Sequence, residues 1–296
     1  MIEKVRTKID FDTILHNVRE KSPIIHNITN YVTVNDCANI LLACGASPIM
    51  ADDIEEVSEI TSFCGGLNIN IGTLNHNSVK SMLAAGKRAN ELGHPAVLDP
   101  VGAGASRLRT ETALKLIDEI RFDVIRGNIS EIKTLAAVGS KDLAAGASGD
   151  SAVGSTKGVD ADIADKVTEE NLDSAVAFVK EFSERTGAVI AVTGAIDIVA
   201  GDGTAYIIRN GHPMMSSITG TGCQLSALTA AFVTANRDCV PEAAAAAVIA
   251  MGVCGETAFK RLGELDGNAT YRNYIIDAVY RLTPEDLKRG ADYEMR

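Results

Sequence analysis

The most informative stretch of this chain, residues 220–233, is Gly220-Thr221-Gly222-Cys223-Gln224-Leu225-Ser226-Ala227-Leu228-Thr229-Ala230-Ala231-Phe232-Val233. The glycines allow a tight turn and a close approach of a ligand to the backbone. The Ala- and Leu-rich run predicts a helix whose first N–H groups have no partner within the helix. Such a helix start attracts phosphate and favours a cysteine thiolate. The alternative is a glycine-rich turn beside a small buried residue, because short glycine patterns occur in many settings.

Strand-like and helical segments alternate on both sides of this stretch. We expect strands at 47–50, 67–71, 96–98, 124–125 and 188–192, a hairpin formed by 197–200 and 205–209, and helices at 13–21, 34–44, 53–64, 77–92, 110–120, 172–186 and over most of 223–280. This alternation predicts an α/β fold with a mostly parallel central sheet and helices on both faces. The Gly-, Ala- and Ser-rich residues 136–160 are expected to form a mobile surface loop. We find no internal repeat, so residues 1–296 are expected to form a single domain.

Composition narrows the class of protein. The chain has 46% hydrophobic and 23% charged residues, which is typical of a globular protein. Its formal charge of −11 and pI near 5.0 argue against a nucleic-acid partner. No stretch predicts a membrane span, since the apolar run at 239–253 is short and Ala-rich. The six cysteines lack metal-binding spacing, and with no secretion signal they indicate reduced thiols in the cytoplasm.

Polar and glycine residues follow the predicted strands, where parallel sheets bind their ligands. These residues are Met50, Gly72-Thr73, Asp99, Arg126-Gly127-Asn128, Thr193-Gly194 and the Gly220 turn. Their convergence at one edge of the sheet is better explained by a site than by packing.

Several blocks occur in an order that marks a family: His26–Val32, Ser47–Met50, Asn70–Leu74, Leu98–Ala103, Ile125–Asn128 with Glu131, Lys157–Asp160 and Gly220–Cys223. In these blocks the chain resembles the hydroxyethylthiazole kinases of thiamine salvage, which have the three-layer ribokinase-like fold. The resemblance implies an alcohol phosphotransferase that moves the ATP γ-phosphoryl group to the primary hydroxyl of 4-methyl-5-(2-hydroxyethyl)thiazole. The matched blocks run from about residue 23 to residue 233, and the stretch at 136–156 is longer than is usual in the family.

The same resemblance assigns the catalytic and ATP-binding residues. Cys223 matches the family's catalytic cysteine, which accepts or helps to remove the proton of the substrate hydroxyl; the alternative is that it only fills space. The sequence contains no Walker A motif, so the turn with Gly222 would hold the phosphates. Arg126 and Thr193 match ATP-contacting positions, although Arg126 alone also fits a surface ion pair.

Asp99 and Glu131 match the acids that hold Mg²⁺ in the family, mostly through water. Without the resemblance, Asp99 before Pro100 is read as a turn cap and Glu131 as a solvated acid in the first turn of a helix.

For the thiazole, the resemblance points to Met50 and Gly220, with Asn30 and Val32 as further candidates. Taken alone, Met50 also fits a core position. The family places each site between the subunits of a homotrimer, with Gly72 and Thr73 supplied by the neighbouring subunit. His26, His94 and His212 are unpaired in the sequence, so we interpret them as structural or solvent-facing residues.

Three other functions are alternatives. An ATP-dependent NAD(P)H-hydrate dehydratase shares the fold but carries Asp in the glycine turn, where this chain has Cys223. A hydroxymethylpyrimidine or pyridoxal kinase fits the fold but not the block at 26–30. A non-catalytic thiazole or thiamine sensor requires that ATP does not bind, and the set of Asp99, Glu131, Arg126 and Cys223 speaks against it.

Overall fold

One sheet runs through the residues that the computed structural model describes, 8–137 and 166–296. Within these ranges its nine strands follow the order β2-β1-β3-β4-β5-β6-β7-β8-β9. The pairs from β2 to β6 are parallel and those from β6 to β9 are antiparallel, which confirms the mostly parallel sheet. The strands are β1 (Ile24–Ile28), β2 (Ser47–Met50), β3 (Gly66–Asn70), β4 (Ala96–Asp99), β5 (Val124–Gly127), β6 (Val189–Val192), β7 (Asp197–Gly201), β8 (Thr204–Ile208) and β9 (Tyr293–Met295).

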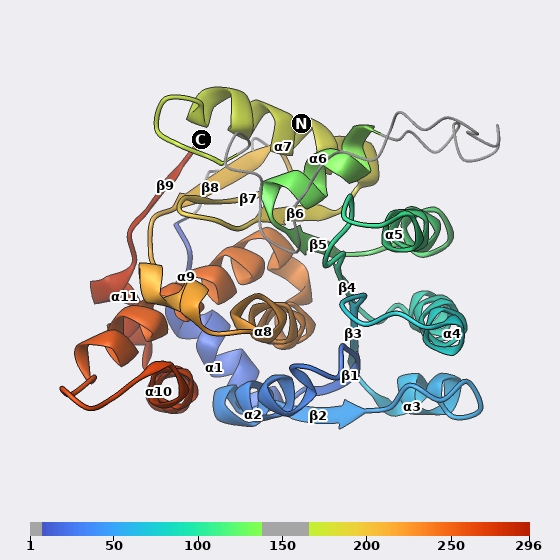
Figure 1. The fold of residues 1–296 in the computed structure, drawn as a ribbon, viewed down its shortest axis with the longest axis horizontal. Coiled ribbons are helices and arrows are strands. Elements are labelled where there is room, and N and C mark those ends of the chain that lie inside the picture. Colours follow the sequence, from blue (N-terminus) through green and yellow to red (C-terminus); the bar gives the residue numbers. More distant parts are fainter. Residues whose placement is uncertain (1–7, 138–165) are drawn as a thin grey trace.

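Helices cover both faces of the sheet, as expected (Figure 1). One layer contains α1 (Phe11–Lys21), α2 (Val34–Cys44), α8 (Thr221–Ala235), α9 (Val240–Lys260), α10 (Asn268–Arg281) and α11 (Pro284–Gly290). The other contains α3 (Val57–Phe63), α4 (His76–Leu92), α5 (Arg107–Glu119), α6 (Ile129–Ala137) and α7 (Leu172–Thr186). Each layer buries its own apolar core against the sheet, so the ends of the strands are held in place from both sides.

Glycines account for several helix boundaries that the sequence predicted well. The predicted helices at 34–44 and 172–186 match α2 and α7, and each is followed by a glycine in the left-handed region, Gly45 at φ 98° and Gly187 at φ 70°. The predicted acidic helix at 53–64 begins later, at Val57. Asp53 instead accepts a hydrogen bond from Glu55 N at 2.9 Å, which forms a turn in place of the first helical residues.

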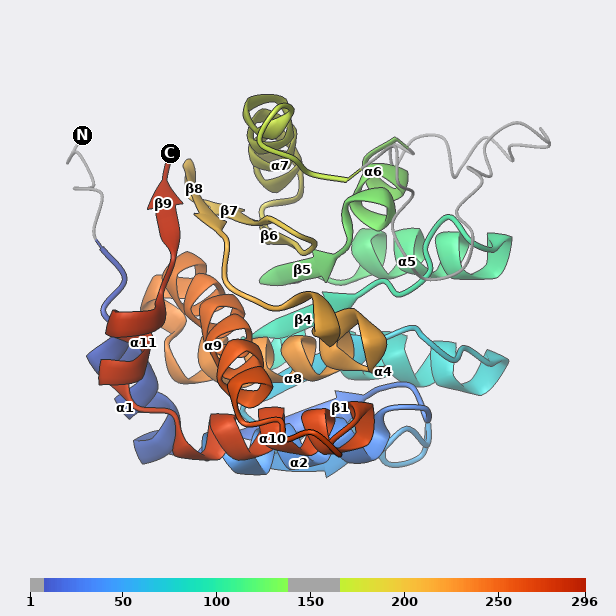
Figure 2. The ribbon, with the colours of Figure 1, turned by 60° about the vertical axis from the view of Figure 1, so that its left-hand side comes forward.

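Two strands were not predicted. β1 carries His26 and Asn27, which hide the apolar pattern of a buried strand. His26 is fully buried, with its ring nitrogens 2.9 Å from Thr61 Oγ1 and from Ala51 O, so the structural interpretation of this histidine is confirmed. β9 pairs antiparallel with β8 and adds the last strand at one end of the sheet (Figure 2). A three-residue strand after a long helical region has too little pattern to be recognised.

The α9 region, 237–260, is long and apolar enough to cross a membrane, but 78% of its most apolar window is buried inside the molecule. The run at 239–253 is therefore a core helix, as expected. The motif Lys157–Asp160 lies outside the described residues, and so does the predicted loop at 136–160 except its first two residues, which end α6.

Candidate active site

The carboxyl ends of four neighbouring strands and the start of α8 form the candidate site. Asn70 and Asp99 end β3 and β4 in register with each other, and Gly127 and Val192 end β5 and β6 in the same way. α8 packs against β3 and β4 on one face of the sheet. The parallel topology therefore brings together residues that lie far apart in the sequence.

The first turn of α8 has the geometry of an anion-binding helix start. Gly220 has φ 86°, in the left-handed region, and its carbonyl accepts the first helical hydrogen bond from Gln224 N at 2.8 Å. The N–H groups of Thr221, Gly222 and Cys223 thus have no partner within the helix. A Cβ on Gly220 would lie 2.5 Å from Thr33 Cγ2, so this position is also sterically restricted.

Asp99 lies fully buried at the centre of the site. Its Oδ2 accepts hydrogen bonds from Asn70 Nδ2 at 2.8 Å and from Ser226 Oγ at 2.7 Å. Burial raises the pKa of Asp99, while Arg126, Ser226 and Asn70 lower it. Its other oxygen, Oδ1, has no hydrogen-bond partner among the described residues, which suits a metal ligand better than a turn cap.

Arg126 lies between the sheet and α8. Its Nη1 is 3.6 Å from Asp99 Oδ2, and its Nη2 donates to Thr193 Oγ1. Only 12% of the Arg126 side chain is exposed, so the alternative of a surface ion pair is wrong. The predicted ATP-contacting residues Arg126, Thr193 and Gly222 are thus brought together, because Arg126 also lies against Gly222.

Glu131 is buried at the start of α6, so the alternative of a solvated helix acid is wrong. Its carboxylate accepts hydrogen bonds from Gly102 N at 2.7 Å and from Asn128 N at 2.8 Å. Burial, and next the nearby charge of Asp99, raise the pKa of Glu131 to about 7, although the two N–H donors and Arg126 lower it. The negative charge of Asp99 thus acts on Glu131. Within residues 8–137 and 166–296, no three His, Cys, Asp or Glu side chains form a metal cluster.

Cys223 is partly buried in the first turn of α8. Asn30 Nδ2 donates to its sulfur at 3.1 Å. Burial raises the pKa of the Cys223 thiol and Asp99 raises it further, while hydrogen bonds from Thr33 and Asn30 and the charge of Arg126 oppose this. The net effect is a raised pKa, so burial opposes the thiolate that the helix start was expected to favour, and only the thiolate can accept a proton.

The other predicted substrate residues differ in their contacts with this cluster. Gly72 N donates to Asn70 Oδ1 at 2.9 Å, and Thr73 Oγ1 accepts from Tyr31 N at 3.2 Å. Val32 is 60% exposed. Met50 ends β2, partly buried against the same apolar core as Cys223. The structure brings Asn30, Gly72 and Gly220 close to the cluster, whereas it gives Met50 and Val32 no hydrogen-bonded link to it.

Sequence reasoning did not single out Asn70, Ser226 or Asp197. Asn70 could have been found, because Asn68 and Asn70 place two amides on one face of an otherwise apolar strand. Ser226 lies one helical turn beyond Cys223. Asp197 Oδ1 accepts from Gly194 N at 2.8 Å and so holds the loop that carries Thr193; burial raises the pKa of Asp197 to about 7.

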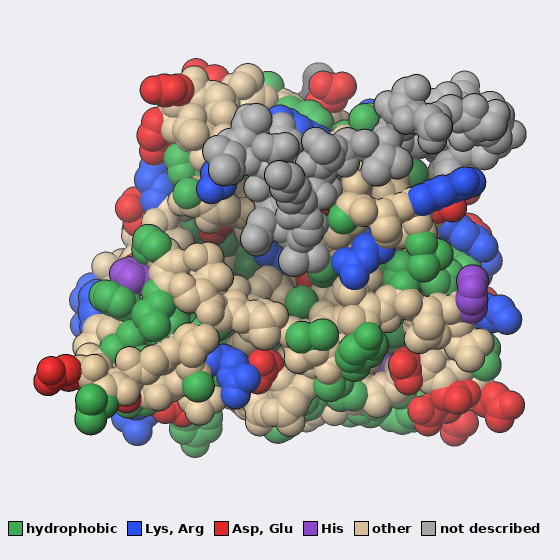
Figure 3. Space-filling view, viewed as in Figure 1, with side chains coloured by type: hydrophobic (Ala, Val, Ile, Leu, Met, Phe, Trp, Pro, Cys, Tyr) green, Lys and Arg blue, Asp and Glu red, His purple; other side chains and the backbone are tan. Residues whose placement is uncertain are grey.

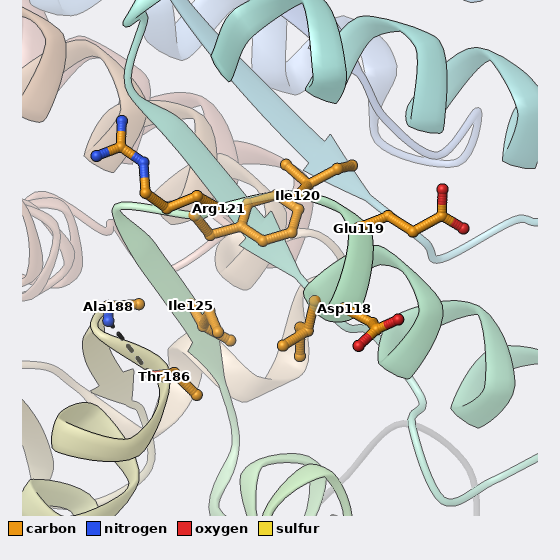
Figure 4. Close-up of a pocket in the computed structure, with 9 residues that line it drawn as sticks. Asp118, Glu119, Ile120, Arg121, Ile125, Thr186 and Ala188 are labelled. Atoms are coloured by element: carbon orange, nitrogen blue, oxygen red, sulfur yellow. Dashed lines mark hydrogen bonds between the residues drawn. The ribbon is translucent and has the colours of Figure 1, made fainter. Parts of the chain in front are cut away.

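A separate cavity of about 260 Å³ lies where β5 and β6 begin, at the opposite edge of the sheet (Figure 4). It is lined by Ile117, Asp118, Glu119, Ile120, Arg121, Phe122, Ile125, Thr186 and Ala188. None of the predicted site residues lines it.

Comparisons with known proteins agree with the geometry. A family model described as the hydroxyethylthiazole kinase family matches residues 15–285. A hydroxyethylthiazole kinase of Clostridium acetobutylicum is 62% identical over 95% of this chain and 97% of its own length. One from Desulfovibrio desulfuricans is 47% identical over 95% and 97%. The solved structure of a hydroxyethylthiazole kinase from Pyrococcus horikoshii has a TM-score of 0.80 and 33% identity, covering 97% of this chain and 98% of that one.

Proposed function

The chain belongs to the hydroxyethylthiazole kinase family, and from this membership we propose that it phosphorylates hydroxyethylthiazole in the candidate site, beside the first turn of α8. It is a ribokinase-like transferase of thiamine biosynthesis that uses ATP to phosphorylate the primary hydroxyl of 4-methyl-5-(2-hydroxyethyl)thiazole. One observation carries the assignment of the site: a helix start, a mostly buried arginine, a buried aspartate and a partly buried cysteine meet at one edge of the sheet.

The transferred phosphoryl group is held by donors that are already in place. The free N–H groups of the first turn of α8 stabilise its charge, and Arg126 approaches from the side of Thr193. Because phosphoryl transfer requires mainly positioning and charge stabilisation, these donors make the largest contribution.

Cys223 acts on the substrate hydroxyl. A bond forms between the hydroxyl oxygen and the γ-phosphorus, the bond from that phosphorus to the leaving oxygen of ADP breaks, and the hydroxyl proton passes to Sγ of the Cys223 thiolate, which becomes the neutral thiol. Cys223 must be the thiolate to accept that proton; burial and Asp99 raise the pKa of the thiol and oppose this form, while the hydrogen bonds from Thr33 and Asn30 and the charge of Arg126 favour it.

Asp99 and Glu131 would hold Mg²⁺ in this proposal. The unpartnered Oδ1 of Asp99 offers a carboxylate oxygen, and Mg²⁺ prefers one or two protein carboxylates together with water and phosphate. When bound, Mg²⁺ neutralises charge on the phosphates of ATP. Arg126 would still pair with Oδ2 of Asp99.

We place the protein in the cytoplasm as a homotrimer in which Gly72 and Thr73 complete the thiazole site of a neighbour, beside Met50, Val32 and Gly220. The free cysteines fit a reducing compartment. Of the exposed large hydrophobic side chains in the described ranges, more than half come from the part of the chain around the edge strand β2: Ile24, Tyr31, Val32, Leu42, Ile54 and Phe63. Figure 3 shows hydrophobic side chains along this lower edge of the molecule. Such an edge is suited to burial against another subunit.

The substrate is tested with one panel. ATP and Mg²⁺ are supplied with hydroxyethylthiazole, hydroxymethylpyrimidine or pyridoxal, and phosphorylated product is measured for each. We expect phosphorylated product from the thiazole only, or far more product from the thiazole than from the other two compounds. Product from the pyrimidine and not from the thiazole contradicts the proposal. Light scattering of the native protein tests the trimer, which an active monomer would rule out.

A further inference from the structure

The side-chain amide of Asn30 has no unused hydrogen-bonding capacity. Its Nδ2 donates to Cys223 Sγ at 3.1 Å and to Asn70 Oδ1 at 3.0 Å. Its Oδ1 accepts from both Thr33 N and Thr33 Oγ1, each at 3.1 Å. An amide offers two hydrogens and two lone pairs, so all four positions are taken. Asn30 is also only 4% exposed, which leaves its amide little access to a ligand.

The partners of Asn30 fix which way its amide points. A flipped amide would place Asn30 Oδ1 against Asn70 Oδ1 and the Asn30 NH₂ group against the N–H of Thr33, which would lose hydrogen bonds on both sides. Asn70 is in turn held by Asp99, since Asn70 Nδ2 donates to Asp99 Oδ2 at 2.8 Å. A chain of hydrogen bonds therefore runs from Asp99 through Asn70 and Asn30 to the sulfur of Cys223.

Thr33 holds the other end of the amide, and Gly220 leaves room for it. A Cβ on Gly220 would lie 2.5 Å from Thr33 Cγ2 and would displace Thr33. The glycine at the start of α8 thus allows the contact on which the orientation of Asn30 depends. This gives Gly220 a role that does not require contact with the thiazole.

We propose that Asn30 is a positioning residue that holds Cys223 Sγ at the start of α8, with its own amide held by Asn70 and Thr33. The inference rests on the proposed function of Cys223 as proton acceptor. Asn30 therefore acts through the cysteine, and its side chain is not a thiazole-binding group. A donor aimed at the sulfur also favours the negatively charged form over the neutral one.

A double-mutant cycle tests this inference. Asn30→Ala is made in the native chain and in Cys223→Ala, and kcat and the KM for the thiazole are measured for all four proteins. We expect Asn30→Ala to lower kcat about tenfold or more in the native chain and to have little further effect when the sulfur is already absent. The KM for the thiazole should change little. An equal fall of kcat in both backgrounds, or a raised KM in both, would overturn the inference.

Alkylation of Cys223 gives a second measurement that requires neither ATP nor substrate. Asn30→Asp keeps the size of the side chain but replaces the donor with an oxygen, so at neutral pH iodoacetamide should alkylate Cys223 about tenfold more slowly. Asp99, Arg126 and Cys37 are the other ionisable groups that act on this sulfur, and the substitution leaves them in place. The modified peptide is identified by mass spectrometry because Cys239 is also partly exposed.

Asn39→Ala is the matched control, since its amide donates to Asn35 within α2 and not to Cys223. Thermal unfolding of each variant shows that it is folded. If Cys223→Ala proves as active as the native protein, the role of Cys223 in the proposed function fails, and alkylation alone then decides the role of Asn30. An Asn30→Asp alkylation rate equal to that of the native protein rejects the inference in either case.

Discussion

Arg126 lies directly against Gly222: a Cβ atom on Gly222 would come within 2.6 Å of Arg126 Nη1. The same guanidinium lies 3.6 Å from Asp99 Oδ2 and donates to Thr193 Oγ1. The glycine therefore leaves room for a cation that is only 12% exposed to lie against the first turn of α8, although the positive end of the helix dipole disfavours a cation there. This arrangement concentrates positive charge at the place proposed for the phosphates of ATP.

Gly222→Ala should displace Arg126 from both of its partners. Loss of charge-assisted hydrogen bonds of this kind should lower kcat/KM for ATP by about 10- to 100-fold. Steady-state kinetics with varied ATP measure the effect. Gly267→Ala is the control, since a Cβ at that position would meet nothing within 4 Å. Kinetics of Gly222→Ala that match those of Gly267→Ala would show that Arg126 does not have to keep this position.

Cys223→Ala should lower kcat by roughly 10²–10⁴-fold, the usual contribution of a positioned acid or base. The KM for the thiazole should change little, because the variant removes one sulfur atom and leaves the turn intact. Cys239→Ala, which alters the other partly exposed cysteine of the described residues, is the control. Turnover unchanged in Cys223→Ala would exclude the sulfur from the mechanism.

Asp99→Asn should abolish most of the dependence on Mg²⁺. The amide oxygen still accepts from Ser226 and Asn70, so the fold is kept while the charge of the metal ligand is lost. We expect turnover to fall by about 10²-fold or more. The native protein should be stabilised against heat by ATP with Mg²⁺, but less so when EDTA removes the metal or in the variant. Asp118→Asn, at the opposite edge of the sheet, should behave like the native protein; full Mg²⁺-dependent activity in Asp99→Asn would contradict the assignment.

Asp197→Asn should change how stability depends on pH. Burial raises the pKa of Asp197 from 3.8 to about 7, so the folded protein binds the proton more tightly than the unfolded chain does. The stability that this proton contributes is complete below pH 3.8 and is lost as the pH rises to about 7. Asparagine does not titrate and still accepts from Gly194 N. The Tm of the variant relative to the native protein should therefore rise by on the order of 5 °C between pH 5 and pH 8.

Thermal unfolding of both proteins at several pH values measures this difference. Ala195→Ser is the control, because Ala195 is an exposed, uncharged residue of the same loop between β6 and β7. A difference in Tm that stays constant across the range would mean that Asp197 is ionised in the folded protein throughout.

The sequence alone predicted the α/β class, the mostly parallel sheet and most helices, because these depend on local patterns. Alternation of apolar segments determines the strands that are buried on both faces, and glycines such as Gly45 and Gly187 end helices in the left-handed region. The order of the motif blocks was also sufficient to identify the family. β1 was missed because His26 and Asn27 are polar in sequence, although both are buried and hydrogen-bonded in the fold.

Only the tertiary structure decided how the site residues act on one another. Asn30 and Cys223 are 193 positions apart, and Ser226 and Asp99 are 127 apart, yet each pair is hydrogen-bonded. Parallel strands bring their carboxyl ends to one edge whatever their separation along the chain, and α8 then packs across that edge. Which amide meets which sulfur or carboxylate depends on this packing, and burial, which raises the pKa of Glu131 and Asp197, follows from it as well. Local sequence cannot encode such contacts, because each partner's position is set by elements elsewhere in the chain.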